Sequence, residues 1–192
     1  MIAIIKYNAG NIRSVQNALD RLGFESVITD DNEIVRKADK VIFPGVGEAG
    51  SAMRYLSEKG LDRLIKSLEQ PVLGICLGLQ LMCSHSEESD TKCLGIFDSQ
   101  VRMFPLTDKV PHMGWNNLFS VKGKLFKGFP VTGDVYFVHS YYAEVSTDTS
   151  AVCEYILPFS AAMQNGNFYA TQFHPEKSAT EGEIILRNFL GL

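Results

Sequence analysis

The sequence predicts an α/β fold, in which a mostly parallel central sheet is flanked by helices and extended by antiparallel strands. Up to Cys76, short apolar runs of strand length alternate with segments of helical spacing, which is typical of a parallel sheet with crossover helices. After about residue 90, short strand-like runs are separated by Pro, Gly, Asp and Ser, which favours antiparallel connections.

The first part of the chain is organised as strands that each lead into a helix. We expect a first buried strand at residues 2–6, a turn at residues 7–10, and a helix capped by Asn11. The apolar face of that helix consists of Ile12, Val15, Leu19 and Leu22, and Gly23 closes it. The further elements expected here are strands at residues 24–28, 40–43 and 72–75, a short helix capped by residues 30–32, and helices at residues 48–58 and 61–68.

The second part is richer in short strands. The runs expected to be extended are residues 101–104, 117–121, 135–138, 141–145, 151–156 and 168–173. Between the first two of these, residues 111–116 have the composition of a loop. Residues 179–190 have the apolar pattern of a helix and close the chain.

Composition excludes several classes of function. The net charge is −4, and no run of Lys and Arg stands out, so a nucleic-acid partner is not expected. No stretch approaches the roughly 20 apolar residues of a membrane span, and the first residues lack the basic segment of a signal peptide. The four cysteines form no C-x-x-C pair, which favours reduced thiols in a cytoplasmic protein.

The chemistry of the chain is concentrated in residues 71–83. The apolar run 72–75 breaks at Gly74-Ile-Cys76-Leu-Gly78, and helical spacing follows. This is the strand-turn-helix pattern of a nucleophile elbow, with cysteine in place of serine. A nucleophile at such a corner has a strained backbone, so the residues two before and two after it must be nearly free of side chain. An ordinary buried cysteine in a strand broken by glycines is the alternative.

A cysteine nucleophile needs a histidine, and the histidine needs an orienting group. His85 is nine residues beyond Cys76, which is roughly 13 Å along a continuous helix and out of reach. His112 lies in the loop-like segment, and His139 ends a strand. His174 is the best candidate because Glu176 lies two residues further on, on the same side of an extended chain, where its carboxylate can bond one ring nitrogen.

Gly74-x-Cys76-x-Gly78-x-Gln80 together with His174-Pro-Glu176 resembles the class I (triad) glutamine amidotransferases. The order and separation of the motifs match, and the resemblance covers essentially the whole chain. It implies a flavodoxin-like fold in a single domain over residues 1–192, with no cofactor and no metal. It also implies hydrolysis of glutamine to glutamate and ammonia through a γ-glutamyl thioester on Cys76, with His174 moving the protons and Glu176 holding the imidazole.

The resemblance also assigns further residues of the site. The oxyanion hole is expected from the backbone of Leu77 and from the loop of Gly45 and Val46, where a peptide flip is coupled to the partner. The residues expected to bind substrate are Gln80, Glu88, Ser140 and Tyr141. For Gln80 the alternative is an amide on a helix surface, and for Glu88 it is a solvated charge.

Three motifs sharpen the resemblance to one branch of the family. They are Pro44-Gly-Val-Gly47, Pro111-His-Met-Gly-Trp-Asn116 and Tyr136-Phe-Val-His-Ser-Tyr141. The first departs from the Pro-Gly-Gly motif of many relatives. In this branch a glutaminase subunit forms a heterodimer with a (β/α)8-barrel cyclase, which uses the ammonia in histidine biosynthesis. The positions expected near that partner are Asn11, Met113, Trp115, Asn116, Tyr136 and Lys177.

Two other functions stay open at this point. One is a related glutaminase that feeds a different synthase, because a catalytic triad does not identify the acceptor of the ammonia. The other is a catalytically silent binding module of the same fold, although Cys76, His174, Glu176 and both glycines of the elbow are present.

Overall fold

The computed structural model describes residues 1–8 and 10–192, so the turn predicted at residues 7–10 lies partly outside the described residues. Its centre is a seven-stranded sheet with the strand order β11-β12-β13-β4-β3-β1-β2. The strands are β1 (Ile2–Ile5), β2 (Ser26–Thr29), β3 (Lys40–Gly45), β4 (Val72–Cys76), β11 (Thr149–Tyr155), β12 (Leu157–Asn165) and β13 (Phe168–Thr171). All pairs from β2 to β13 are parallel, while β12 and β11 extend the sheet in antiparallel fashion. The predicted fold class is therefore confirmed.

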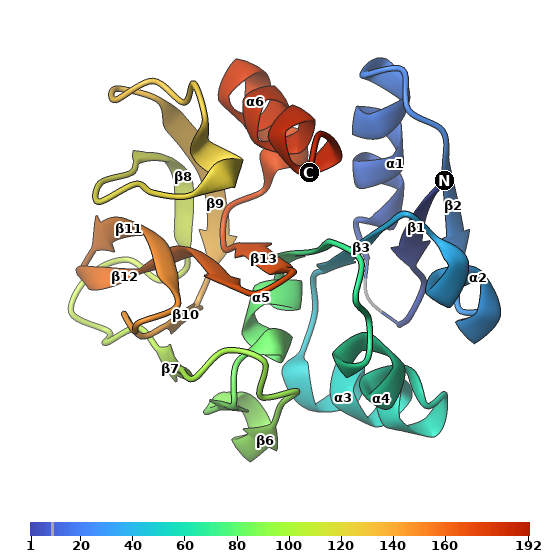
Figure 1. The fold of residues 1–192 in the computed structure, drawn as a ribbon. Helices are drawn as coiled ribbons and strands as arrows, with labels where there is room; N and C mark the ends of the chain where they lie inside the picture. The colour runs from blue at the N-terminus through green and yellow to red at the C-terminus, as the bar shows by residue number, and fades with distance from the viewer. Residues whose placement is uncertain (9) are drawn as a thin grey trace.

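Helices cover both faces of this sheet (Figure 1). The helices are α1 (Ile12–Arg21), α2 (Asn32–Lys37), α3 (Ala49–Glu58), α4 (Leu61–Lys66), α5 (Leu77–Met82) and α6 (Ala179–Leu190). Helices α1 and α6 pack on one face, against side chains such as Ile4 and Leu73. Helices α2 to α5 pack on the other face, against side chains such as Val41 and Phe43. The alternation of strand residues between two apolar clusters explains why these strands are apolar throughout.

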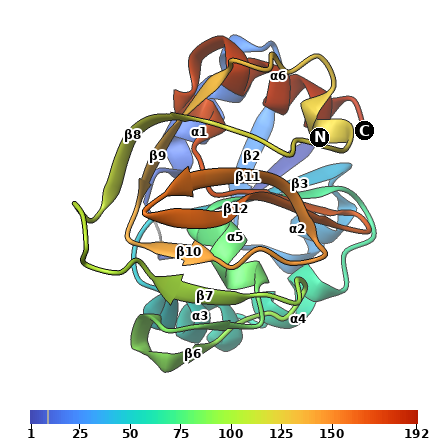
Figure 2. The same cartoon turned by 90° about the vertical axis from the view of Figure 1, so that its left-hand side faces the viewer.

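Two smaller sheets lie beside the extension of the central sheet (Figure 2). One has the order β10-β7-β5-β6 and the other pairs β8 with β9. Their strands are β5 (His85–Ser86), β6 (Thr91–Lys92), β7 (Gln100–Met103), β8 (His112–Asn117), β9 (Asp134–His139) and β10 (Tyr141–Ala143). Three 3₁₀ turns complete the described elements, η1 (Glu88–Asp90), η2 (Lys124–Phe126) and η3 (Pro175–Lys177).

The structure corrects three local predictions. Residues 111–116 are not a loop, because most of them belong to β8, which pairs with β9. The strand predicted at residues 117–121 is reduced to an isolated bridge between Phe119 and Val152. The strand β12 is not predicted as such, since its sequence Leu-Pro-Phe-Ser-Ala-Ala-Met-Gln-Asn lacks the alternation and β-branched residues that mark a strand.

Helix capping is the other correction. Asp31 caps α2 as predicted, since its carboxylate accepts bonds from the N–H groups of Glu33 and Ile34. Asn11 precedes α1 but makes no side-chain capping bond, and its backbone has φ 70°. Its amide is used elsewhere, at the site described next.

Candidate active site

Cys76 lies at the corner where β4 ends and α5 begins, as the elbow pattern predicts. Its backbone has φ 55° and ψ −107°, a region that residues with a side chain rarely occupy. Such strain persists only where the surrounding structure imposes it, and it is typical of functional sites. The corner places the Cys76 side chain at the carboxyl end of a central parallel strand, where α/β sheets bind their ligands.

The two glycines of the elbow are required by close packing. A Cβ on Gly78 would overlap the carbonyl oxygen of Phe43 in β3, and a Cβ on Gly74 would lie 2.9 Å from the Met82 sulfur. The first of these contacts is with backbone, which cannot move aside as a flexible side chain can. Gly78 therefore lets α5 sit directly against the neighbouring strand, so that the corner can be sharp.

Replacing Gly78 by alanine is expected to lower the free energy of unfolding by roughly 3 kcal/mol or more, because the new methyl group overlaps a strand carbonyl. Urea unfolding of the variant, followed by circular dichroism, measures this loss. Gly191 is the matched control, since a Cβ there would lie 3.4 Å from its nearest neighbour. Equal stability of the Gly78→Ala and Gly191→Ala proteins would contradict the packing described here.

His174 and Glu176 form the buried pair that the sequence predicts. The Nδ1 atom of His174 lies 2.8 Å from Glu176 Oε1, and both side chains are fully buried. The pair is held where β13 runs into η3, so Glu176 lies in a 3₁₀ turn and not in the extended chain assumed in the prediction. Asn11 adds a contact that sequence reasoning missed, because its amide Nδ2 donates to the same carboxylate oxygen.

The second ring nitrogen of His174 is not engaged by Glu176. His174 Nε2 is buried and has no hydrogen-bond partner among the described residues. Burial lowers the pKa of His174, but the interactions with Cys76 and Glu176 outweigh it and raise this pKa above its ordinary value. The imidazole thus lies between a thiol and a carboxylate, an arrangement that can move a proton from sulfur to a leaving group.

Hydrogen bonds to the backbone of β9 hold the segment that carries His174 and Glu176. The His174 N–H donates to the Tyr136 carbonyl over 2.9 Å, and the Tyr136 N–H donates to Ser178 Oγ over 2.9 Å. The Ser178 hydroxyl in turn donates to the His174 carbonyl. Three bonds therefore fix the loop from His174 to Ser178 before any substrate binds.

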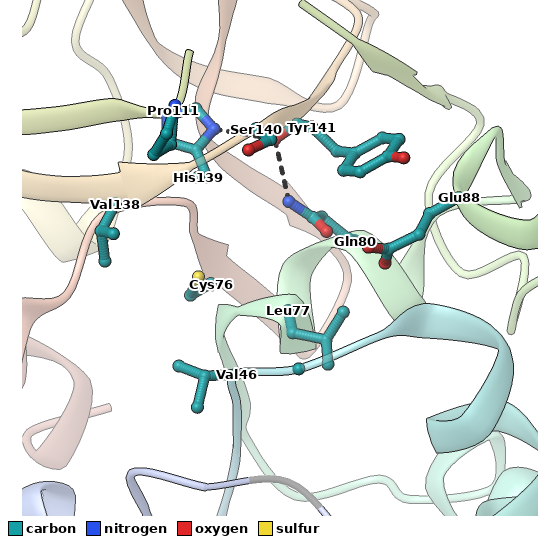
Figure 3. Close-up of a pocket in the computed structure, with 11 residues that line it drawn as sticks. Val46, Cys76, Leu77, Gln80, Glu88, Pro111, Val138, His139, Ser140 and Tyr141 are labelled. Atoms are coloured by element: carbon teal, nitrogen blue, oxygen red, sulfur yellow. Dashed lines mark hydrogen bonds between the residues drawn. The ribbon is translucent and has the colours of Figure 1, made fainter.

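Cys76 lines a cleft of about 280 Å³ (Figure 3). The residues that line the cleft are Val46, Gly47, Cys76, Leu77, Gln80, Glu88, Pro111, Val138, His139, Ser140 and Tyr141. All four residues predicted to bind substrate are among them. His174 and Glu176 do not line the cleft.

Gln80 and Glu88 are both held in the cleft by specific bonds. Gln80 is buried, and its Nε2 donates to the Tyr141 carbonyl over 2.9 Å and to Gln172 Oε1 over 3.1 Å. The alternative of a surface amide is therefore wrong. Glu88 accepts a bond of 2.8 Å from the Ala49 N–H, and burial raises the pKa of its carboxyl. It is a half-buried carboxylate facing the cleft, and not a freely solvated charge.

Gln172 is a site residue that sequence reasoning did not single out. Its side chain is fully buried, its Oε1 accepts from Gln80, and its Nε2 lies 3.7 Å from the Cys76 sulfur. It therefore links the elbow cysteine to the predicted substrate glutamine. Its position two residues before His174 was the available signal, because alternate residues of an extended chain share a side.

The loop predicted to supply oxyanion donors lies at the end of β3. The Gly45 backbone lies so close to the Tyr7 side chain that a Cβ on Gly45 would overlap the Tyr7 hydroxyl. The Val46 carbonyl accepts a bond of 3.4 Å from the Gly10 N–H, and Gly47 has φ 131°. The φ of Gly47 is one that glycine adopts without strain, so the backbone of this loop is less restricted there than at a residue with a side chain.

Five of the six positions predicted near a partner lie on β8, β9 and η3, and the sixth, Asn11, precedes α1 and contacts Glu176 of η3. Met113 and Trp115 are 58% and 53% exposed, and the Trp115 ring packs against Tyr136. Trp115 and Lys177 also line one surface pocket together with Glu176, and this pocket shares no lining residue with the substrate cleft. Asn116 differs from the others, because its amide turns inward and donates to the Glu154 carbonyl over 3.0 Å.

Two further histidines are buried beside the cleft as neutral imidazoles. Burial lowers the pKa of His112 to about 4 and that of His139 to about 3, although the bond to the Tyr141 carbonyl opposes the shift at His139. Both values lie below the ordinary value of about 6.5 that these groups have in the unfolded chain. The unfolded chain therefore binds more protons than the folded one between about pH 3 and pH 6.5.

The stability that His112 and His139 contribute as neutral groups is therefore expected to be fully present above about pH 6.5. It is expected to be lost as the pH falls towards 4 and then 3. The loss is about 1.4 kcal/mol per pH unit for each histidine in its window. Urea unfolding at pH 7.5, 6 and 5 measures the slope. The variant with both His112→Phe and His139→Phe should show a shallower slope, and an unchanged slope would contradict neutral buried imidazoles.

Neither a metal cluster nor a membrane span occurs in the part of the chain that the structure describes. Within residues 1–8 and 10–192, no group of three or more His, Cys, Asp or Glu side chains could hold a metal ion. No helix among these same residues is long and apolar enough to cross a membrane.

Comparison with known proteins places these features in context. The family model "Glutamine amidotransferase class-I" matches residues 3–191. The chain is 62% identical to the imidazole glycerol phosphate synthase subunit HisH of Bacteroides fragilis, covering 100% of this chain and 99% of the relative. It is 45% identical to the HisH subunit of Vibrio cholerae, covering 100% and 98%.

Solved structures agree on the fold. A structure described as a glutamine amidotransferase matches with a TM-score of 0.75 at 20% identity, covering 100% of this chain and 98% of that one. The crystal structure of a glutamine amidotransferase from Thermotoga maritima matches with a TM-score of 0.66 at 17% identity, covering 99% and 80%.

Proposed function

The chain belongs to the class-I glutamine amidotransferase family, and we propose that it is the glutaminase subunit of imidazole glycerol phosphate synthase. It hydrolyses L-glutamine to glutamate and ammonia in histidine biosynthesis, with one glutamine amidotransferase domain over residues 1–192. The observation that carries this proposal is the 62% identity to a HisH subunit over the whole chain. The strained Cys76 beside the buried pair of His174 and Glu176 supports the chemistry.

In the proposed reaction, the Cys76 sulfur attacks the carbon of the glutamine side-chain amide. The C–N bond breaks, His174 passes the thiol proton to the departing ammonia, and a γ-glutamyl thioester remains on Cys76. His174 then takes a proton from water, whose oxygen attacks the thioester carbon. The C–S bond breaks, glutamate is released, and His174 returns the proton to the Cys76 sulfur. Glu176 holds the imidazole and stabilises its charged form, which agrees with the raised pKa of His174.

The negative oxygen of each tetrahedral intermediate needs donors placed where its charge develops. The Leu77 N–H at the elbow supplies one donor. The loop of Gly45 and Val46 supplies the other after a flip of the peptide between them, which turns the Val46 N–H towards the cleft. At the far end of the cleft, Glu88 receives the substrate ammonium, and Gln80 with the backbone of Ser140 and Tyr141 completes the pocket. The lining of the cleft by these residues supports the assignment.

The partner in this proposal is a (β/α)8-barrel cyclase, which forms a heterodimer with this chain and uses the ammonia to make imidazole glycerol phosphate. The complex then has lyase activity. Exposed Met113 and Trp115, with Tyr136 and Lys177, suit such a contact because large amphipathic rings anchor protein interfaces. Trp115 and Lys177 line a pocket with Glu176 of the triad, which supports a route for ammonia on this side of the protein.

We also infer that the protein works in the cytoplasm. The four cysteines, Cys76, Cys83, Cys93 and Cys153, are free and buried within the described residues. Free cysteines are the usual state in a reducing compartment, where a catalytic thiol stays available.

A glutaminase assay with and without the cyclase tests the proposed function. We expect release of ammonia from glutamine to rise when the histidine-pathway cyclase and its nucleotide ligand are added, and the two proteins to elute together from a sizing column. The control is the same cyclase with free ammonium in place of glutamine and this chain. If the two proteins neither associate nor produce imidazole glycerol phosphate from glutamine, the acceptor of the ammonia is a different synthase.

A further inference from the structure

The proposed reaction uses neither His112 nor His139, yet these two buried side chains contact each other next to the cleft. His112 begins β8 and His139 ends β9, and the two residues are partners across the strand pair. The Nδ1 atom of His112 lies 3.0 Å from Nε2 of His139. Of the two, only His139 lines the substrate cleft.

The hydrogen-bond partners determine which nitrogen of each ring carries the proton. His139 Nδ1 lies 2.7 Å from the Tyr141 carbonyl, which can only accept, so this nitrogen carries the hydrogen. Because the ring is neutral, its Nε2 must then accept, and the donor is Nδ1–H of His112. His112 Nε2 is left as an acceptor, and the Asn116 amide lies 3.4 Å from it.

The amide of Asn116 is itself oriented. Its Nδ2 donates to the Glu154 carbonyl over 3.0 Å, and its Oδ1 accepts from the Asn117 N–H over 2.9 Å. The nitrogen therefore faces His112, as the assignment of the two rings requires. Asn116, His112, His139 and the Tyr141 carbonyl form one directional series of hydrogen bonds, which we call the histidine chain.

An aromatic cage keeps both rings in place. His112 is stacked between Tyr155, at 4.1 Å between ring centroids, and Phe137, at 4.7 Å. His139 packs against Phe104 and Phe159, at 5.3 and 5.1 Å. The cage excludes water, so each ring nitrogen must find its partner within the protein. Flat imidazole rings with polar atoms on opposite sides can stack in the cage and form a hydrogen bond at each end.

The end of the histidine chain lies in the substrate cleft. The Tyr141 carbonyl accepts from His139 Nδ1 and also from Gln80 Nε2, over 2.9 Å (Figure 3). Two donors thus hold one carbonyl. The bond from His139 joins the last residue of β9 to the first residue of β10, with Ser140 between them. We propose that His139, with its tautomer set by His112, is a positioning residue that holds Tyr141 and Gln80 in the geometry that binds glutamine. This inference rests on the proposed function, since it concerns the same substrate cleft.

Two double variants that differ in one donor test the proposal. His112→Phe/His139→Phe replaces both polar rings by apolar rings of similar shape, so no buried donor is left unpaired between them. His112→Phe/His139→Asn restores a side-chain amide that can donate to the Tyr141 carbonyl. Each protein is assayed for glutamine hydrolysis in complex with the cyclase, and its thermal unfolding is recorded.

We expect the double phenylalanine variant to show a KM for glutamine about tenfold above that of the asparagine variant, the size of one lost hydrogen bond. Their kcat values should agree within about twofold, because the triad is unchanged. Equal KM values in two folded proteins, or a loss of kcat at constant KM, would overturn the positioning role. Absence of glutamine hydrolysis in the wild-type complex would instead refute the proposed function.

A measurement on the wild-type protein keeps the proposal testable if either variant fails to fold. Long-range ¹⁵N–¹H correlation spectra distinguish the two tautomers of a neutral histidine. We expect His112 and His139 both to carry hydrogen on Nδ1 at pH 7. A hydrogen on Nε2 of His139, or a charged ring, would overturn the proposal, since the Tyr141 carbonyl would then lack its donor or the two rings would repel.

Discussion

Replacing Cys76 by alanine is expected to abolish glutamine hydrolysis by the complex, with a loss of kcat of ~10⁴-fold or more. Alanine has no atom that can form the thioester, and the strained corner at φ 55° offers the substrate no other nucleophile. The cyclase reaction driven by free ammonium should keep its rate, because ammonia enters it after the glutaminase step. Parallel assays with glutamine and with ammonium chloride measure both quantities.

Cys153→Ala is the matched control, since Cys153 is a buried free cysteine in β11 that does not line the cleft. It should retain glutamine hydrolysis. An electrophile that mimics glutamine should label the wild-type protein at Cys76, and glutamine should compete with it. If the Cys76→Ala protein still releases ammonia from glutamine at the wild-type rate, the assignment of the nucleophile is wrong.

The elbow could be predicted from sequence because its determinants are local. Gly74 and Gly78 flank Cys76 within five residues, so the motif can be recognised from sequence, although the backbone that Gly78 packs against belongs to the neighbouring strand β3. The pair of His174 and Glu176 is local in the same sense, although the turn that joins them is 3₁₀ and not extended. Residues that are close in sequence can therefore be paired correctly even where the predicted secondary structure between them is wrong.

The remaining contacts depend on tertiary structure. Asn11 has the sequence position of a helix cap, but it is near Glu176 only because α1 begins beside η3. The sequence places His112 in a loop, since Gly114 and Pro111 interrupt the pattern of its strand. Its partner His139 lies 27 residues away, and only the pairing of β8 with β9 brings the two together. Sequence spacing carries no signal for such pairs.

Replacing Glu176 by glutamine is expected to lower kcat by roughly 10²-fold, in the range of general acid–base contributions. The amide oxygen can still accept from His174 Nδ1, so the tautomer and position of the ring are kept. What is lost is the negative charge that helps to raise the pKa of His174. The imidazole then loses its proton at lower pH, and it can no longer protonate the departing ammonia there.

The pH dependence of kcat/KM distinguishes charge from geometry. Since removal of the carboxylate lowers the pKa of His174, the alkaline limb of the profile should move to lower pH in Glu176→Gln. The control is Glu58→Gln, a change of an exposed carboxylate at the end of α3. If Glu176 only orients the ring, kcat falls at every pH and the alkaline limb stays in place.

Asn11 separates the two roles further, because it donates to the same oxygen of Glu176 without carrying charge. Asn11→Ala leaves the carboxylate and its bond to His174 intact, so the alkaline limb should not move to lower pH. The expected loss of kcat is a few-fold to about tenfold, the size of one neutral hydrogen bond. A loss as large as that of Glu176→Gln would mean that the position of the carboxylate, and not its charge, controls the imidazole.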